Sequence, residues 1–261
     1  MYSVIISSLG RINYLNELLQ SIYNQTLLPK EIIILLDQNE YCKKGEEFIK
    51  KQGICKIIFC KELNLSQKRN FGAEISNSQY IIFSDDDDIW ESNKAELTMI
   101  ALKNSQIVCH EFYKFGHVYQ KPKFLLGKET KTISNNDLLS GSNVFGGGSG
   151  IAGRKEIFLS FPFDEEYLFC EDFNWWTKVV LAEIRIKYIP IPLVQYRTHN
   201  KNMTSNFFKI YFFNLKIFKD LFYKSFILLF ASFFGFLKSS VKFFILLLVN
   251  LLFKKFKRTN K

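Results

Sequence analysis

Short apolar runs and amphipathic stretches alternate through the first 105 residues of this chain. The runs that predict β-strands are Ser3–Ser7, Glu31–Leu36, Ile54–Cys60 and Tyr80–Phe83. The stretches with apolar residues at helical spacing are Arg11–Gln25, Lys43–Gln52, Ser66–Ser76 (with Ser66 as the expected N-cap) and Ser92–Lys103. Strands that are apolar throughout are buried on both faces. The alternation therefore predicts an α/β fold, a Rossmann-like and mostly parallel central sheet flanked by helices.

Three polar segments follow strands of this expected sheet. They are Ser7–Arg11, Asp37–Asn39 and Asp85–Asp88. The carboxyl ends of parallel strands meet at one edge of a sheet, and ligands bind in the crevice outside that edge. We therefore expect the three segments to line one binding site.

The four consecutive aspartates Asp85–Asp88 place the strongest constraint on that edge. Two unit charges about 4 Å apart repel by roughly 1 kcal/mol in water, and by about 4 kcal/mol at the effective dielectric of a protein surface. The cluster therefore either splays into solvent or holds a divalent cation through its carboxylate oxygens. The apolar strand before it and Ile89-Trp90 after it favour the cation, and Mn²⁺ or Mg²⁺ suits oxygen ligands.

The pattern is less regular after residue 106. Gly141–Gly153 is rich in glycine, which predicts a flexible loop that lets a ligand approach closely. It lacks the GK[ST] ending of a phosphate-binding P-loop. Glu171–Ala182 has helical spacing, and Arg185–Ile189 and Val194–Tyr196 are expected to be short strands.

The excess positive charge is confined to the last quarter of the chain. Residues 201–261 hold 12 Lys and Arg and one acid, Asp220, whereas residues 1–200 hold 23 basic and 24 acidic residues. The last quarter also holds 15 of the 28 phenylalanines. A basic stretch this apolar is typical of a membrane-surface element, and a nucleic-acid-binding arm would be polar. We therefore expect a folded domain over 1–204, a membrane-associating helical tail over 205–261, and no nucleic-acid partner.

Projection of the tail on an α-helix gathers its charges on one side. At 100° per residue, six charged residues fall within a stripe about 80° wide, namely Lys209, Lys216, Asp220, Lys224, Lys238 and Lys242. The apolar windows between them are short for a perpendicular span. The stripe predicts an amphipathic segment, 207–258, that lies in the headgroup plane of a membrane. A short hairpin or tilted span and a soluble oligomerisation helix are the alternatives.

Cysteine usage indicates a reducing compartment. The five cysteines form no CxxC pair and no Cys/His cluster, which favours reduced thiols in a cytosolic protein. Met1–Gly10 is a short apolar run with no basic residues before it, so we do not expect it to be a secretory signal.

An ordered set of motifs resembles that of the family 2 glycosyltransferases, enzymes of the GT-A fold. The motifs are Glu31–Asp37, Gln67–Gly72 (similar to the family's A-R-N-x-G), Asp85–Asp88 followed by Trp90 (similar to its D-x-D-D), Phe163–Glu165, Glu171-Asp172 and Gln195–His199. The resemblance covers about Tyr2 to Thr204. It implies a donor-binding half over about 1–105 and an acceptor-side half over about 106–204. The implied reaction is sugar transfer, with inversion, from a nucleotide-sugar donor (a UDP-sugar by default) to a hydroxyl.

The resemblance also implies roles for individual residues. Asp87 is the expected metal ligand, with Asp85 and His199 as further candidates, and Asp85 and Asp86 also face the ribose. The other residues expected to bind the donor are Ser7, Ser8, Arg11, Asp37 and Arg69. Asp172 is the expected general base, with Glu171 beside it to orient the site.

Plain structural alternatives exist for several of these residues. They are a helix-surface charge for Arg69, a turn residue for Asp37, helix capping for Glu171-Asp172 and a structural role for His199. Trp175 and Trp176 either stack on the sugar faces of an acceptor or pack in the core.

Two loops depart from the family's pattern. Ser7–Arg11 stands where the family usually has P-T-x-N-R, and Leu36–Asn39 stands where it usually has D-D-G-S. A non-catalytic member that binds a nucleotide sugar or scaffolds other enzymes therefore stays an alternative. Nucleotidyl transfer is a further alternative, disfavoured because the first loop of nucleotidyltransferases is usually glycine-rich and basic, and Ser7–Arg11 is not.

The tail and the resemblance together predict a glycan or lipid-linked acceptor at the cytoplasmic face of a bacterial inner membrane, in surface polysaccharide or lipooligosaccharide synthesis.

Overall fold

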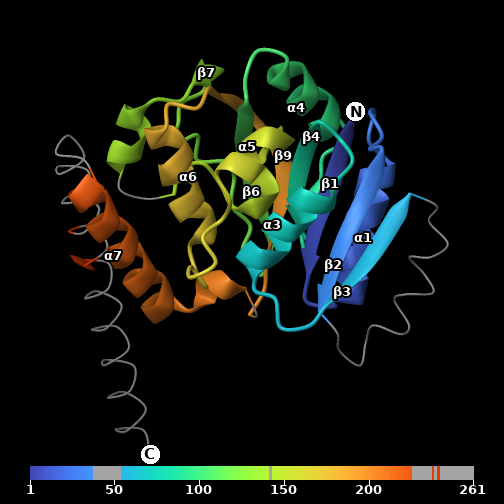
Figure 1. The fold of residues 1–261 in the computed structure, drawn as a ribbon, viewed down its shortest axis with the longest axis horizontal. Coiled ribbons are helices and arrows are strands. Elements are labelled where there is room, and N and C mark those ends of the chain that lie inside the picture. Colours follow the sequence, from blue (N-terminus) through green and yellow to red (C-terminus); the bar gives the residue numbers. More distant parts are fainter. Residues whose placement is uncertain (38–53, 141–142, 201, 225–236, 238–239, 242–261) are drawn as a thin grey trace, which may run out of the picture. The chain divides into compact units, whose positions relative to one another are not determined.

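The computed structural model describes residues 1–37, 54–140, 143–200, 202–224, 237, 240 and 241 (Figure 1). The expected helix Lys43–Gln52 and most of the expected tail lie outside these residues. The chain divides into two compact units. One comprises Met1–Asn135 with Asn143–His199, and the other comprises Asn136–Ser142 with Asn200–Lys261.

The first unit contains a nine-stranded sheet with helices, as the α/β prediction requires. Its strands are β1 (Tyr2–Ser8), β2 (Glu31–Asp37), β3 (Cys55–Cys60), β4 (Tyr80–Asp85), β5 (Ile89–Trp90), β6 (Ile107–Gly116), β7 (Lys131–Thr132), β8 (Ala152–Arg154) and β9 (Ile186–Thr198). Its helices are α1 (Ile12–Tyr23), α3 (Leu65–Ile75), α4 (Lys94–Leu102), α5 (Lys155–Ser160) and α6 (Glu171–Leu181).

The strand order is β3-β2-β1-β4-β8-β6-β9-β5, with β7 also paired to β9. The four strands from β3 to β4 are mutually parallel, and β6 is parallel to β9. The pairings of β8, β5 and β7 are antiparallel. The parallel half therefore ends at one edge, and the second half continues the same sheet with mixed directions.

Helices cover both faces of the parallel half because its strands are apolar on both sides. Alternate side chains of β1 and β2, such as Ile6 and Ile34, form one core cluster with the apolar stripe of α1. On the opposite face, α3 approaches closely at Gly72, where a Cβ would lie 2.5 Å from Ile5 Cγ2 and 3.0 Å from Leu35 Cδ1. Each large apolar side chain buried here contributes about 1.5–3 kcal/mol.

Two local predictions were wrong. Helix α3 is capped by Asn64 instead of Ser66: the Asn64 side chain accepts from the Gln67 backbone N–H, and the Gln67 side chain accepts from the Asn64 backbone N–H. The two short strands expected near residues 185–196 are one strand, β9. Its proline Pro192 lies opposite Glu111, at the point where the register with β6 shifts, and such an irregularity tolerates a residue without an N–H.

The described part of the second unit contains α7 (Phe207–Lys224). Lys209, Lys216 and Asp220 of the expected charged stripe lie on it, and the rest of that stripe beyond Lys224 lies outside the described residues. Among the described residues, no helix combines the length and apolar character needed to cross a membrane. Membrane association of the tail stays a prediction.

Candidate active site

The carboxyl ends of β1, β2 and β4 lie side by side, as their parallel register requires. Ser7 pairs with Asp85, and Ser8 pairs with Leu36. The polar segments that follow these strands therefore meet at one edge of the sheet, as predicted. We call the part formed by Ser7–Arg11 and Asp85–Asp88 the aspartate edge. Gln38 and Asn39 lie outside the described residues.

Arg11 joins two of the four aspartates. Its guanidinium donates to Oδ1 of Asp86, and its Nη1 donates to Oδ2 of Asp87 at 2.6 Å. Asp86 is fully buried, and its Oδ2 also accepts from the Ser8 hydroxyl at 2.6 Å and from the Leu9 backbone N–H at 3.1 Å. Burial acts to lower the pKa of Arg11, but the carboxylates of Asp86 and Asp87 raise it above its ordinary value. Arg11 is therefore a fixed cation inside the edge.

His199 approaches the same carboxylate from just beyond the end of β9. Its Nε2 lies 2.9 Å from Oδ2 of Asp87 and 3.0 Å from Nη1 of Arg11, and its ring stacks on Tyr14. Burial raises the pKa of Asp87; Arg11 opposes this rise, and the adjacent aspartates add to it. His199 therefore contacts the aspartate edge directly, which is the placement that the resemblance implied.

Asp87 and His199 carry ligand atoms of the kind that a divalent cation binds, and Nη1 of Arg11 lies 2.6 Å and 3.0 Å from the same two atoms. In the described part of the chain, no three His, Cys, Asp or Glu side chains are already grouped as a metal-binding set. The 2.9 Å between Oδ2 of Asp87 and Nε2 of His199 nevertheless fits two neighbouring ligands, each about 2.1 Å from an octahedral ion. Carboxylate oxygens suit Mn²⁺ and Mg²⁺, and neutral imidazole is the commonest side-chain metal ligand. Ligation by Asp87, Asp85 and His199 stays a prediction.

Arg69 links the aspartate edge to helix α6. It is 1% exposed, and it donates to Oδ1 of Asp85 at 2.9 Å and to Oε1 of Glu171 at 2.7 Å. Burial acts to lower its pKa, but Asp85 and Glu171 raise it above the ordinary value. Arg69 is therefore not a helix-surface charge. The Glu171 side chain binds Arg69 instead of capping α6, whose N-cap residue Cys170 makes no side-chain capping hydrogen bond.

The glycine-rich segment packs against this bridge. A Cβ on Gly148 would lie 2.8 Å from Cζ of Arg69 and 2.9 Å from Oδ1 of Asp85, so the position requires glycine. The segment from 143 onward includes the 3₁₀ turn Gly148–Gly150 and strand β8, and Phe145 and Ile151 are buried. The expected flexible loop is thus a packed segment in its described part. The close approach at Gly148 is to a side chain of the protein itself.

Asp172 occupies the first turn of α6, next to Glu171. Its Oδ2 accepts from Nδ2 of Asn143 at 2.9 Å, and its Oδ1 accepts from the Phe173 backbone N–H at 2.7 Å. Burial raises the pKa of Asp172 to about 7, the negative charge of Glu171 adds to the rise, and Arg69 opposes it. A carboxyl group with a pKa near 7 exchanges protons readily at neutral pH, as a general base must.

Asp37 ends strand β2 in an ion pair. Its Oδ1 lies 2.5 Å from Nζ of Lys68, which also donates to the backbone oxygen of Ser8 at 3.1 Å. Lys68 is 2% exposed and so ties the ends of two strands together. Asp37 is therefore more than a turn residue, and the donor-binding roles of Asp37, Ser7 and Ser8 stay predictions.

A second pair of charges is buried beside the aspartate edge. The ammonium group of Lys94 donates to the backbone oxygen of Ser149 at 2.5 Å and lies 4.1 Å from the ring centroid of Trp90. Burial lowers the pKa of Lys94 to about 7, and Asp88 opposes the fall. Burial raises the pKa of Asp88 well above its usual value, and the charge of Asp87 adds to this. The net charge of the cluster therefore depends on both groups.

Lys68, Lys94 and Asn143 were not predicted as site residues from the sequence. A signal exists for the two lysines, because each lies among the residues that its helix buries, next to Arg69 in α3 and Ala95 in α4. A lysine within the buried stripe of a helix marks a paired interior cation. Asn143 belongs to an irregular segment, where periodicity carries no such information.

Trp175 and Trp176 pack in the core. Both side chains are fully buried. Trp175 stacks on Phe158 and Phe163 with ring centroids 5.3 Å and 5.2 Å apart, and its Nε1 donates to the backbone oxygen of Phe161. Of the two alternatives, core packing is the one that the structure supports, so neither ring is available to stack on a sugar.

Comparison with known proteins gives one family and one fold. The model of Glycosyl transferase family 2 matches residues 3–160. The cholesterol galactosyltransferase of Borreliella burgdorferi is 29% identical over 208 residues, which are 72% of this chain and 57% of that protein. An uncharacterized glycosyltransferase of Methanocaldococcus jannaschii is 28% identical over 202 residues, or 72% of this chain and 67% of that protein. The chain thus spans little more than half the length of the first of these relatives.

Solved structures share the architecture. The crystal structure of S. aureus TarS 1–349 in complex with UDP-GlcNAc superposes with a TM-score of 0.69, at 17% identity, over 85% of this chain and 66% of that chain. A second TarS structure, in complex with UDP, gives a TM-score of 0.63 at 18% identity over 83% of this chain and 65% of that chain. At this identity the likeness establishes the GT-A type of fold.

Proposed function

The chain belongs to glycosyl transferase family 2, and from this premise we propose that it moves a sugar from a UDP-sugar to a hydroxyl of a glycan or lipid-linked acceptor. The observation that carries the proposal is the division of carboxylates between two places. Asp85–Asp87 crowd the end of a parallel sheet beside Arg11 and His199. Asp172, with a pKa raised to about 7, lies at the start of α6.

The aspartate edge suits the diphosphate end of the donor. Departure of a nucleoside diphosphate concentrates negative charge on its oxygens, and cations near them stabilise that charge. Arg11 is one such cation on this chain. Asp87, with His199 and Asp85, would hold Mn²⁺ or Mg²⁺, which acts as a Lewis acid toward phosphate oxygens when bound. The likeness to TarS, whose structures contain UDP-GlcNAc and UDP, supports a UDP-sugar as the first donor to test.

Asp172 suits the acceptor hydroxyl. Its carboxylate accepts the hydroxyl proton while the hydroxyl oxygen bonds to the anomeric carbon of the donor. The bond from that carbon to the diphosphate breaks in the same step, and the diphosphate leaves with the electron pair. A single displacement of this kind inverts the anomeric configuration. Asn143 and the Phe173 backbone N–H fix the two carboxylate oxygens before the reaction.

The proposed acceptor lies at a membrane. The relative from Borreliella burgdorferi is named for a lipid acceptor, cholesterol. The basic, phenylalanine-rich residues 207–258 of this chain suit the anionic cytoplasmic face of a bacterial inner membrane. We therefore place the reaction in the synthesis of a surface polysaccharide or lipooligosaccharide. A chain that ends before residue 207 is expected to leave the membrane fraction in a flotation assay.

The test is a donor screen with the full chain. UDP-galactose, UDP-GlcNAc and UDP-glucose are compared with GDP-mannose, each with Mn²⁺, Mg²⁺ or EDTA. A UDP-sugar with a divalent ion is expected to raise the melting temperature, because a ligand that binds the folded state stabilises it. The same mixtures are then assayed for release of UDP. If no nucleotide sugar binds under any of these conditions, the proposed function is wrong. If a nucleotide sugar binds but no UDP is released with any acceptor supplied, the chain is a non-catalytic member of the fold.

A further inference from the structure

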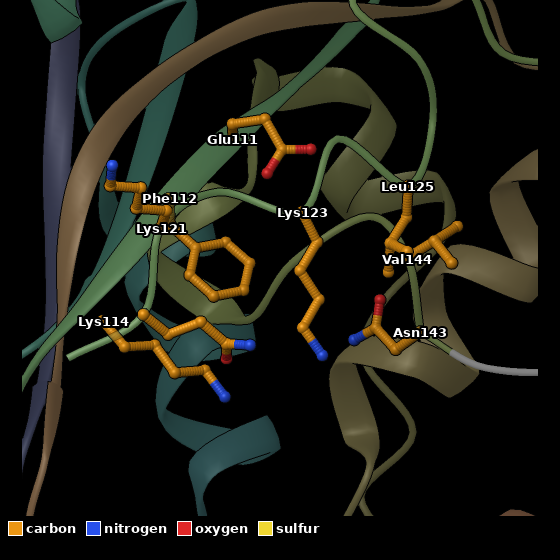
Figure 2. A pocket seen from close by; sticks show the side chains of 9 residues that line it. Glu111, Phe112, Lys114, Lys121, Lys123, Leu125, Asn143 and Val144 are labelled. Carbon is orange, nitrogen blue, oxygen red and sulfur yellow. The ribbon is translucent and has the colours of Figure 1, made fainter. Parts of the chain in front are cut away.

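A pocket with a basic lining opens next to the proposed general base. It has a volume of about 190 Å³, and its lining includes Lys114, Lys121, Lys123, Phe112, Leu125 and Asn143 (Figure 2). We call it the lysine pocket. It lies outside the aspartate edge, on strand β6 and the residues that follow it. With each water occupying about 30 Å³, it has room for roughly six, or for one sugar ring or one phosphate group.

The segment that lines this pocket is more basic than the rest of residues 1–200. Residues 114–131 contain five lysines and one acid, whereas residues 1–200 as a whole carry one more acid than base. One carboxylate, Glu111, also lines the pocket, and its Oε1 accepts from the Tyr188 hydroxyl at 2.7 Å. Three lysines against one carboxylate leave the lining with a net positive charge. An anion bound between lysine side chains of this lining is attracted by each of them.

Backbone hydrogen bonds and a proline constrain the segment that carries the lysines. Lys114 and Gln120 exchange two backbone hydrogen bonds, at 2.9 Å and 3.0 Å, which close the loop between them against β6. Pro122 separates Lys121 from Lys123 and restricts the backbone there. In Figure 2, Lys114 and Lys123 extend toward the same side of the pocket, whereas Lys121 extends away from them. Lys114 and Lys123 are therefore the pair placed to hold one anion.

Asn143 connects the pocket to the reaction. Its side chain lines the pocket, and its Nδ2 donates to Oδ2 of Asp172 at 2.9 Å. A molecule that fills the pocket thus lies against a direct neighbour of the proposed base. The remaining wall is apolar at Phe112, Val144 and Leu125, which suits the C–H face of a sugar ring. The lining combines what a charged sugar needs, an apolar face and cations at its rim.

We propose that the lysine pocket binds an anionic group, a phosphate or carboxylate, on the acceptor, so that the acceptor class is an anionic glycan or glycolipid. This inference rests on the proposed function. It adds the requirement that the acceptor carry its charge close to the hydroxyl that reacts. The anion forms charge-assisted hydrogen bonds with Lys114 and Lys123, and a sugar ring next to it covers Phe112. A neutral acceptor lacks these contacts and binds more weakly.

The test uses the full chain saturated with UDP, so that the aspartate edge is occupied. Methyl glucoside, its 6-phosphate and methyl glucuronide are titrated by calorimetry, and dihexanoyl phosphatidylglycerol tests a phosphate carried by a lipid headgroup. The charged sugars are expected to bind at least about tenfold more tightly than the neutral one. Tighter binding of the lipid than of the sugar phosphate would assign the charge to a lipid headgroup, and the reverse order would assign it to the glycan.

A matched pair of variants isolates the pocket. Lys114→Gln with Lys123→Gln keeps much of each side chain and removes both charges, and it is expected to lose about tenfold or more in affinity for the anionic probes. Lys128→Gln removes a charge from the same segment outside the pocket lining, and it is expected to bind as the unchanged chain does. Equal losses in both variants, or equal binding of neutral and charged sugars, would overturn the inference.

The two proposals fail in different ways. Failure of the unchanged chain to bind UDP counts against the proposed function, and the charged probes then still report on the pocket. Retained UDP binding with no dependence on Lys114 and Lys123 counts against the pocket alone. Melting temperatures of the variants are measured first, and because Lys123 is exposed and Lys114 only half-buried, both variants are expected to fold.

Discussion

The aspartate edge and the lysine pocket carry opposite charges and are built in opposite ways. At the edge, Arg11 is half-buried and pairs with the buried carboxylates of Asp86 and Asp87, and next to the edge the buried Lys68 pairs with Asp37 at the end of β2. At the pocket, Lys121 and Lys123 are exposed and follow a loop. Removing one partner from a buried pair costs several kcal/mol, whereas a change to an exposed charge costs little. The proposed donor side is therefore built from ion pairs on which the fold depends, whereas charges of the proposed acceptor pocket can be replaced at little cost in stability.

The most severe test of this division is Asp172→Asn. Removing the general base is expected to lower the turnover number by up to about 10⁴-fold. Binding of UDP and the melting temperature should change little, because the new amide keeps the shape of the side chain and the aspartate edge is untouched. Turnover and UDP affinity are measured on the same preparation.

Glu96→Gln is the matched control for this variant. Glu96 is an exposed carboxylate on α4 that accepts from the Thr26 hydroxyl at 2.9 Å, so its removal is expected to leave turnover within a factor of two. Turnover of Asp172→Asn close to that of the control would remove Asp172 from the reaction.

Arg69→Met tests whether the fold depends on the bridge between the two sides. The substitution keeps the volume of the stem and leaves the carboxylates of Asp85 and Glu171 without their shared cation. We expect the free energy of unfolding to fall by about 3–5 kcal/mol, as for other buried pairs that lose one partner. Chemical denaturation measures it. Arg185→Met, at an exposed arginine, is expected to stay within about 0.5 kcal/mol, and an equal loss in the two variants would contradict a special role for Arg69.

Strand ends could be predicted from the sequence, and side-chain pairings could not. The apolar runs Ser3–Ser7 and Tyr80–Phe83 specify buried parallel strands, and the parallel register then brings their carboxyl ends together. The roles of Asp87, Asp172 and His199 came from the resemblance and stay predictions, although the structure brings His199 to Asp87. Which cation meets which carboxylate depends on helix rotation and rotamers, so the contact of Lys68 with Asp37 was not foreseen.

The acceptor side was harder to predict for a physical reason. Its residues lie in the irregular stretch between Ile107 and Lys155. The sequence there has no helical or strand periodicity, so it does not indicate which way a side chain points. Arg185–Ile189 and Val194–Tyr196 were predicted as two short strands, and they form one strand, β9, because a register shift with the partner strand accommodates Pro192. The lysines of the pocket could be counted in the sequence, but their position beside Asn143 could not be derived from it.

Gly148→Ala tests the packing between the two sides more gently. The new Cβ would meet the guanidinium of Arg69 and Oδ1 of Asp85. Overpacking of this kind costs typically 1–3 kcal/mol, which we expect in the free energy of unfolding. Gly150→Ala, in the same segment, is the control, since a Cβ there would meet the Phe145 backbone oxygen at 3.5 Å, an ordinary van der Waals contact. An equal loss at Gly148 and Gly150 would show that the segment yields readily and that the bridge is not tightly packed.

The smallest expected effect is a shift of the pH profile. Asp172 acts as a base only when deprotonated, and burial followed by repulsion from Glu171 raises its pKa to about 7. Below that pH, kcat/KM is therefore expected to fall by about tenfold per unit, and above it to reach a plateau. Glu171→Gln removes the repelling charge and leaves Arg69, which lowers the pKa of Asp172, so the acidic limb should move to lower pH.

Lys114→Gln with Lys123→Gln should leave the limb in place and raise only the KM for an anionic acceptor, because these lysines bind substrate without touching the base. If the acidic limb shifts in the lysine variant and not in Glu171→Gln, the charges of the lysine pocket set the pKa of Asp172, and the division between the two sides of the site is wrong.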